Sequence, residues 1–180
     1  MSEHPAITDE AGRLPAPLNP PGVRNGAAPT IRTAVRAIVV RDGRLLVTVN
    51  ENDSGRFLLI PGGGQDWGES AVEALAREVR EEVGCEVVVG DLVCVRDYLP
   101  ARLGPAGAPE AWFHQQELFF ACALAEGSEP AHVGRHERWQ RGIAWVELAG
   151  ILQAPLWPRA LRPWLLADPA TRPVYLGAVS

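Results

Sequence analysis

Residues 63–85 read GGQDWGESAVEALAREVREEVGC, and this stretch decides the fold. Its apolar residues recur at the three- and four-residue spacing of an amphipathic helix. They are Val72, Leu75, Ala76, Val79 and Val83. Gly84 stands where a left-handed C-terminal cap belongs, because glycine adopts that conformation without steric cost. The pattern predicts a helix over residues 69–83 that buries one apolar face.

The same helix carries three glutamates toward its C-terminal end, Glu78, Glu81 and Glu82. Their spacing predicts that they project from one side, away from the apolar face. On an exposed helix such like-charge pairs cost only about 0.2–0.5 kcal/mol, so a solvated charged face stays open as an alternative. Under partial cover, two carboxylates about 5 Å apart repel by about 3 kcal/mol, and a cation is then required. Because every donor is an oxygen, the predicted metal is Mg²⁺ or Mn²⁺.

A glycine-rich segment precedes the helix. Pro61 ends a predicted strand directly before Gly62, Gly63 and Gly64. Glycine lets backbone groups approach a ligand or metal closely, so we expect Gly62 and Gly63 to contribute to binding. A lysine-dependent phosphate-binding loop is excluded, because Glu69 occupies the position that such a loop gives to lysine.

Outward from this stretch, the chain alternates strand patterns with turns. A hairpin is predicted over residues 34–49, strands over 57–60, 87–95, 113–124 and 143–146, loops over 100–109 and 126–141, and a final helix near 161–165. Strands on both sides of a helix, followed by a second helix, indicate the α/β class and an α/β/α sandwich with a mixed β-sheet.

Composition narrows the class of protein further. The length of 180 residues suits one domain, which we place at residues 31–180. Residues 1–30 hold six prolines, so we expect a disordered leader there. The formal charge of −5 disfavours bulk nucleic-acid binding. Without an apolar run of membrane-spanning length or a signal peptide, the expected location is the cytoplasm and no membrane partner is expected.

Two residue types exclude further chemistry. All 17 basic residues are arginines, so Schiff-base catalysis by lysine is ruled out. Cys85, Cys94 and Cys122 are odd in number and lack the close paired spacing of zinc sites. We therefore expect three reduced and mostly buried thiols rather than a disulfide framework.

The spacing within residues 63–85 resembles the Nudix box of the Nudix (MutT-like) hydrolases. The matching pattern is Gly63, five residues, Glu69, seven residues, and then REVREEVG, which ends at Gly84. The flanking segments LIPGG at residues 59–63 and WVEL at residues 145–148 also look like the family, so the resemblance extends over residues 33–166. Cys85 is one departure, because the family usually has a larger aliphatic residue there.

This resemblance implies a Nudix-type sandwich that hydrolyses a nucleoside diphosphate linked to another group, by means of metal-activated water. By position, Glu78, Glu81 and Glu82 match the metal ligands of the family, and Glu78 is also a candidate for the base. Arg77 is expected to orient a carboxylate through a charge-assisted hydrogen bond, and Glu69 to support it. Mg²⁺ or Mn²⁺ is the implied cofactor, and a homodimer is consistent with the family.

The family often uses a further acid downstream of the box, and this chain offers two candidates. Glu117 lies in a predicted strand, where an outward-facing strand residue is an equal alternative. Glu137 lies in the second predicted loop, where a surface glutamate is the ordinary interpretation.

The implied substrate is a nucleotide-derived small molecule, either ADP-ribose-like or a nucleoside triphosphate. Pro100, 15 residues beyond Cys85, resembles an offset found in ADP-ribose-hydrolysing members. Four aromatic residues are candidates to stack on a base, although packing is the commoner role of such residues. They are Trp67, Trp112, Phe113 and Trp139. The alternatives are a catalytically silent nucleotide-sensing or interaction domain, and a structural domain with a charged helix.

Overall fold

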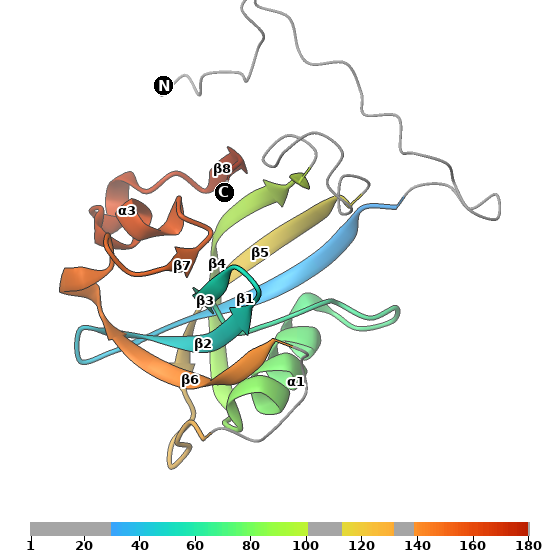
Figure 1. The fold of residues 1–180 in the computed structure, drawn as a ribbon. Helices are drawn as coiled ribbons and strands as arrows, with labels where there is room; N and C mark the ends of the chain where they lie inside the picture. Colours follow the sequence, from blue (N-terminus) through green and yellow to red (C-terminus); the bar gives the residue numbers. More distant parts are fainter. Residues whose placement is uncertain (1–29, 101–112, 132–138, 180) are drawn as a thin grey trace, which may run out of the picture.

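The computed structural model describes residues 30–100, 113–131 and 139–179. In chain order their elements are β1 (Arg32–Arg41), β2 (Arg44–Asn52), β3 (Gly55–Leu59), α1 (Ala71–Val83), β4 (Val87–Tyr98), β5 (Gln115–Leu124), β6 (Gln140–Glu147), β7 (Leu156–Trp157), α3 (Leu161–Leu166) and β8 (Tyr175–Ala178), as Figure 1 shows. Short 3-10 turns occupy Leu148–Gly150 and Pro169–Thr171. The predicted hairpin, strands and helices are therefore confirmed as elements.

The strands form one mixed sheet in the order β7-β3-β2-β1-β5-β4-β8, and β6 pairs with β2 off this path. Strand β1 lies at the centre, antiparallel to β2 and parallel to β5. Asp42 and Gly43 join β1 to β2 with positive φ angles of 51° and 73°. Two successive residues in the left-handed region suit the twist of a tight hairpin, which is why the Asp-Gly pair signals one.

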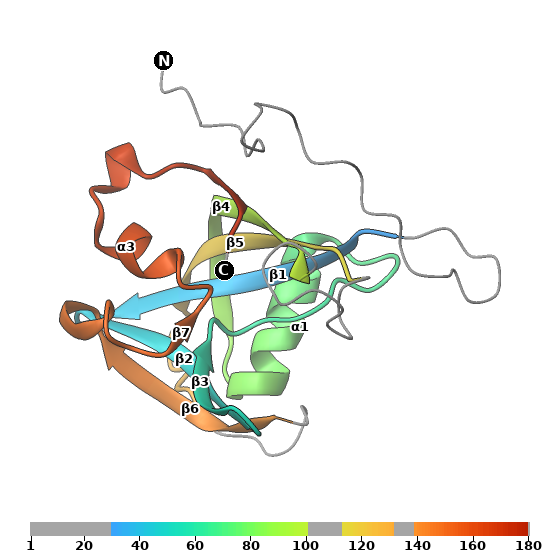
Figure 2. The same ribbon diagram turned by 45° about the horizontal axis from the view of Figure 1, so that its top comes forward.

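Two hydrophobic cores lie on opposite faces of β1, because successive side chains of a strand point to opposite faces. Ile38 packs with Phe119 of β5 and Trp164 of α3. Val39, the next residue along, packs instead with Val79 of α1. Figures 1 and 2 show α1 and α3 on either side of the sheet. The predicted α/β/α sandwich with a mixed sheet is confirmed.

Local sequence explains the limits of α1. Ser70 is the N-cap and makes a capping box with Glu73, so the helix begins at Ala71 rather than at Glu69. Gly84 ends it with φ of 61° and donates its N–H to the carbonyl of Arg80. The buried side chains of the helix are Ala74, Leu75, Val79, Glu82 and Val83. The C-terminal cap expected from the sequence is thus confirmed, and a glutamate is among the buried residues.

The structure corrects or leaves open several boundaries. Strand β6 begins at Gln140, inside the predicted loop over residues 126–141, and β7 and β8 are too short for the sequence pattern to reveal. Residues 1–29 of the predicted leader and most of the 100–109 loop lie outside the described residues. In the described part of the chain, no helix is long and apolar enough to cross a membrane. All three cysteines are free thiols, two buried and one half-buried, as predicted.

Candidate active site

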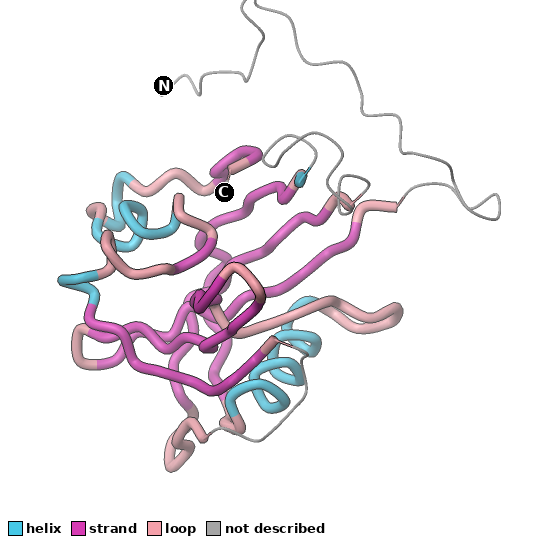
Figure 3. The backbone as a smooth tube through the Cα atoms, in the orientation of Figure 1, coloured by secondary structure: helices cyan, strands magenta, loops and turns pink. Residues whose placement is uncertain are grey.

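The glycine segment runs alongside β1 and is hydrogen-bonded to it. Carbonyl oxygens of Pro61 and Gly63 accept hydrogen bonds from Ala37 N and Val35 N at 2.8 and 2.9 Å. Gly62 between them has φ of 130°, and a Cβ there would overlap the carbonyl oxygen of Val35. Only glycine combines that conformation with so close an approach of two backbones. Figure 3 traces this loop outward from the sheet before it returns to α1.

Two glutamates of α1 meet this glycine segment. Glu82 is only 7% exposed as a residue, and its Oε2 accepts a hydrogen bond from Gly62 N at 2.8 Å. The Glu78 carboxylate lies directly beside Gly63, where a Cβ would stand 2.5 Å from Cδ of Glu78. The missing glycine side chain is therefore the space that the Glu78 carboxylate fills.

The three glutamates differ in their surroundings, which corrects the expectation of one common outward side. The Glu78 side chain is 13% exposed and that of Glu81 is 43% exposed, whereas Glu82 is buried with the apolar residues of the helix. The glycine loop lies against Glu78, and packing of the helix against the sheet buries Glu82. A solvated charged face is thus wrong for Glu78 and Glu82.

Arg77 links the loop to the helix. Its Nε and Nη2 donate to the two carboxylate oxygens of Glu69 at 2.8 and 2.9 Å, and Nη2 also donates to Gly64 O at 2.9 Å. Its Nη1 donates to Glu78 Oε1 at 2.8 Å and lies 3.6 Å from Glu81 Oε2. A guanidinium has five donors in a fixed plane, so one side chain orients carboxylates on both sides of it.

These contacts change the titration of the groups involved. The hydrogen bonds from Arg77, together with the backbone N–H of Asp66, lower the pKa of Glu69 to about 2. The same carboxylates of Glu69 and Glu78 raise the pKa of Arg77. Glu69 and Arg77 therefore stay charged as a pair through the whole physiological range.

The oxygen donors of this region suit a hard divalent cation. Within the described ranges, no group of three or more histidine, cysteine, aspartate or glutamate side chains is gathered to hold a metal ion. Glu78 and Glu81 nevertheless direct an oxygen each at the same nitrogen of Arg77. Both carboxylates thus reach one positive centre. The metal set Glu78, Glu81 and Glu82 remains a prediction.

Of the two candidate acids downstream, Glu117 is described and Glu137 lies outside the described residues. Glu117 is 3% exposed, so the outward-facing alternative is wrong. Its Oε1 accepts from Arg36 Nη2 at 2.9 Å, and its Oε2 accepts from Arg96 Nε at 2.5 Å. Burial raises the pKa of this carboxyl, but Arg36 and Arg96 outweigh that effect and leave the pKa below its ordinary value.

Sequence reasoning missed Arg36 and Gln140, which contact the glycine loop and the end of α1, and also Arg96, which pairs with Glu117 away from the loop. Gln140 Nε2 donates to the backbone carbonyl of Glu82 at 2.7 Å, near the end of α1. The Oε1 atom of Gln140 is buried and has no hydrogen-bond partner among the described residues. A charged side chain inside an apolar strand pattern was the available signal for Arg36. Gln140 lies in the predicted loop and Arg96 just beyond a predicted strand, so neither carried that signal.

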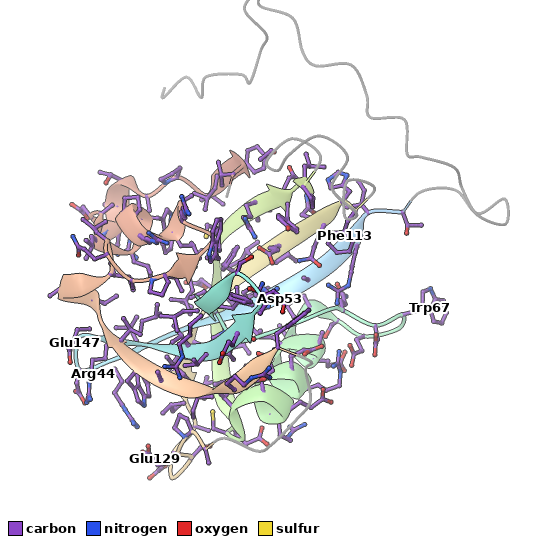
Figure 4. The ribbon with its side chains drawn as sticks, in the orientation of Figure 1. Arg44, Asp53, Trp67, Phe113, Glu129 and Glu147 are labelled. Carbon is purple, nitrogen blue, oxygen red and sulfur yellow. The ribbon has the colours of Figure 1, made fainter. Side chains whose placement is uncertain are left out.

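The aromatic candidates differ in their surroundings. Trp67 is fully exposed, and Figure 4 shows it at the tip of the loop before α1, directed away from the body of the molecule. Phe113 packs edge-on against Tyr98, with ring centroids 6.1 Å apart. Trp139 is half-buried, and Trp112 lies outside the described residues.

The NUDIX domain model matches residues 30–166 of the chain. The protein belongs to the NUDIX domain family. The matched range includes the glycine loop and α1. Residues 63–85, which resemble the Nudix box, lie inside the matched range, and the predicted family is confirmed.

Curated relatives are distant. The chain is 27% identical over 99 residues to "Putative ADP-ribose pyrophosphatase YjhB" of Bacillus subtilis, which covers 55% of this chain and 44% of that protein. It is 32% identical over 120 residues to "Nucleoside triphosphatase NudI" of an Enterobacter strain, which covers 64% of this chain and 81% of that protein. The match with YjhB thus spans less than half of that relative's length.

A solved structure supports the fold independently. The crystal structure of a MutT Nudix hydrolase from Burkholderia pseudomallei superposes with a TM-score of 0.53 at 25% identity. The superposition covers 67% of this chain and 85% of that one. The architecture is therefore the Nudix-like α/β fold, with a mixed sheet and, in the described ranges, the helices α1 and α3.

Proposed function

We propose that this Nudix domain is a divalent-metal-dependent pyrophosphohydrolase. It cleaves a phosphoanhydride bond in a nucleoside diphosphate linked to another group, either a sugar, as in an ADP-ribose-like substrate, or a further phosphate, as in a nucleoside triphosphate. One observation carries the proposal. The glycine loop on β1 seats two box glutamates, Glu78 beside Gly63 and Glu82 on the N–H of Gly62.

The donor set fits Mg²⁺ or Mn²⁺. Glu78, Glu81 and Glu82 supply only carboxylate oxygens, and Glu78 and Glu81 already converge on one cationic nitrogen of Arg77. Hard divalent ions prefer such oxygens and often share them with substrate phosphates. When bound, the ion would polarise a phosphoryl oxygen and lower the pKa of a bound water. These three residues would hold it.

The remaining residues prepare the site. Gly62 N–H fixes one oxygen of Glu82, which orients that buried carboxylate before any ligand arrives. Arg77 binds Glu69 through two parallel hydrogen bonds and reaches Glu78 with its third nitrogen, so the loop and the helix hold each other in place. Glu78 is the first candidate to accept a proton from the attacking water, and Glu137 is the second candidate.

The names of two relatives support the class of substrate. The names of the relatives point to an ADP-ribose pyrophosphatase and to a nucleoside triphosphatase. Both reactions break a phosphoanhydride bond and differ only in the group beyond the second phosphate. We therefore keep the shared chemistry as the proposal and leave the group beyond it to the experiment.

A panel of nucleotides tests this proposal directly. ADP-ribose, UDP-sugars and nucleoside triphosphates would be incubated with Mg²⁺ or Mn²⁺, and products separated by ion-exchange chromatography. We expect metal-dependent release of a nucleoside monophosphate from at least one of them. Glu82→Gln keeps the acceptor for Gly62 N–H but removes the charge, and should lower kcat by about 100-fold or more.

Glu86→Gln is the matched control. Glu86 lies just beyond the box and pairs with Arg80 at 2.6 Å on the exposed surface, away from the glycine loop. Its activity should equal that of the unaltered protein. Tight nucleotide binding by calorimetry without turnover of any substrate would refute the enzyme assignment and favour the silent nucleotide-sensing domain.

A further inference from the structure

A buried polar cluster lies on the face of the sheet opposite α1. It consists of Arg36 on β1, Arg96 on β4 and Glu117 on β5, together with Gln115. Arg96 pairs with Glu117 in the β4–β5 register, and Arg36 lies two residues along β1 from Ala34, which pairs with Glu117. The side chains of Arg36, Arg96 and Glu117 are only 16%, 8% and 4% exposed. Buried charges need such partners, because their desolvation is otherwise costly.

Every oxygen of the Glu117 carboxylate accepts hydrogen bonds inside this cluster. Oε1 accepts from Arg36 Nε at 3.1 Å, from Arg36 Nη2 at 2.9 Å and from Gln115 Nε2 at 3.0 Å. Oε2 accepts from Arg96 Nε at 2.5 Å. A carboxylate engaged in this way is poorly placed to take a proton from water, which argues against Glu117 as the catalytic base.

Arg36 also reaches the glycine loop. Its Nη1 donates to Gly62 O and lies 3.5 Å from Ile60 O. The N–H of the same Gly62 donates to Glu82 Oε2 at 2.8 Å. One glycine residue therefore joins the cluster on one face of the sheet to the buried glutamate of the Nudix box on the other.

Gly62 has little freedom between these two contacts. Its Cα carries no side chain because a Cβ would overlap Val35 O and stand 3.0 Å from Cα of Arg36. The N–H and the carbonyl of Gly62 belong to two rigid peptide planes that meet at this closely packed Cα, so a displacement of the carbonyl moves the Cα and, with it, the N–H. A shift of Arg36 away from Gly62 O would then move the donor that orients Glu82.

We infer that Glu117 is a positioning residue, which holds Arg36 on the Gly62 carbonyl and thereby sets the place of the Glu82 carboxylate. This inference deepens the proposed function, on which it rests for its kinetic readout. It replaces the role of base or metal ligand suggested for Glu117 by the family resemblance. Arg36 becomes the second positioning residue, and the chain of contacts from Glu117 through Arg36 and Gly62 to Glu82 is called the relay.

The experiment compares three single variants of the full chain and one double variant. Arg36→Met and Glu117→Gln break the relay, whereas Arg96→Met removes a partner of the other Glu117 oxygen that does not touch the loop. Besides Glu117, Arg96 contacts residues away from the loop: it donates to Val179 O at 2.6 Å and stacks on Tyr98. We expect the two relay variants to lower kcat by about 10- to 100-fold, as outer residues of a metal site typically do. Arg96→Met should stay within about threefold of the unaltered protein, because it leaves Arg36 on Gly62 O.

Three readouts separate positioning from a merely structural role. The acid limb of the pH profile of kcat should persist in Glu117→Gln, because the base is retained. Mn²⁺ alone, titrated by electron paramagnetic resonance, should bind about tenfold more weakly to both relay variants. The Gly62 amide resonance should shift in both relay variants and stay in place in Arg96→Met. The double variant Arg36→Met with Glu117→Gln should be no worse than the worse single one, since both act through one contact.

Several results would overturn the relay. Loss of the acid limb in Glu117→Gln would make Glu117 the base. An unchanged Mn²⁺ affinity and Gly62 resonance in Arg36→Met would disconnect the cluster from the site, and an equal loss in Arg96→Met would reduce it to a packing role. If Glu117→Gln fails to fold, Arg36→Met decides, because there Glu117 keeps Arg96 as its counter-ion. If the unaltered protein turns over no nucleotide, the proposed function fails, while Mn²⁺ binding and the Gly62 resonance still decide the relay.

Discussion

A single methyl group at Gly63 should separate the activity of this protein from its stability. The Cβ of an alanine there would stand 2.5 Å from Cδ and 2.7 Å from Oε1 of Glu78. Ordinary contacts between such atoms lie near 3.5 Å, so the carboxylate must retreat by about 1 Å. The φ angle of Gly63 is not in the left-handed region, so the backbone itself accepts alanine.

The expected effects of Gly63→Ala on stability and on activity differ in size. The obstacle is the far end of a flexible side chain, and alanine also reduces the freedom of the unfolded chain by about 0.4–1 kcal/mol. The free energy of unfolding should therefore change by less than about 1 kcal/mol. Displacing a catalytic group by about 1 Å, in contrast, costs about 100-fold in rate. Gly63→Ala should thus be folded and nearly inactive.

Two neighbouring glycine variants provide the comparison. Gly62→Ala meets the backbone of Val35 at a φ of 130°, so its free energy of unfolding should fall by about 2 kcal/mol or more. Gly142→Ala on β6 meets nothing within 4 Å and should change neither property. Urea unfolding and kcat on the fastest substrate of the panel measure both quantities for each variant. If Gly63→Ala keeps full kcat, the seating of Glu78 by Gly63 is irrelevant to the reaction, and the reasoning is wrong.

Further predictions concern the helix cap, the acid range and the thiols. Ser70→Ala removes the capping box of α1 and should lower the free energy of unfolding by about 1 kcal/mol in urea, with the Ser54→Ala variant as an unaffected control. The pKa of Glu69 is lowered to about 2, so its pairing with Arg77 stabilises the fold fully above pH 4.5 and is lost as the pH falls toward 2. Acid unfolding of Glu69→Gln should show a shallower dependence over that window, and an identical dependence would contradict the pairing. Burial raises the pKa of Cys94 to about 12, so a thiol reagent at pH 8 should label Cys94 only after denaturation.

The helix of the Nudix box was predictable because its signals are local. Apolar spacing and a C-terminal glycine act within one or two turns, so the predicted start of α1 lies within two residues of the observed start, which the Ser70 cap sets. The Asp42-Gly43 turn is equally local, since it depends only on two residues that accept positive φ. Strands β7 and β8 were not predictable, because two- and four-residue strands carry no periodicity of their own.

By itself, the sequence determined the family, the box spacing and the identity of the acidic residues, since each is written in consecutive positions. Tertiary structure alone decided that Glu82 is buried on Gly62 and that Glu117 lies between Arg36 and Arg96. The first contact joins the glycine loop to α1 across 20 positions, and the other two join β1, β4 and β5 across 21 to 81 positions. Pairing across such separations depends on strand register and on which face each side chain occupies, and neither property has a signature within a single segment.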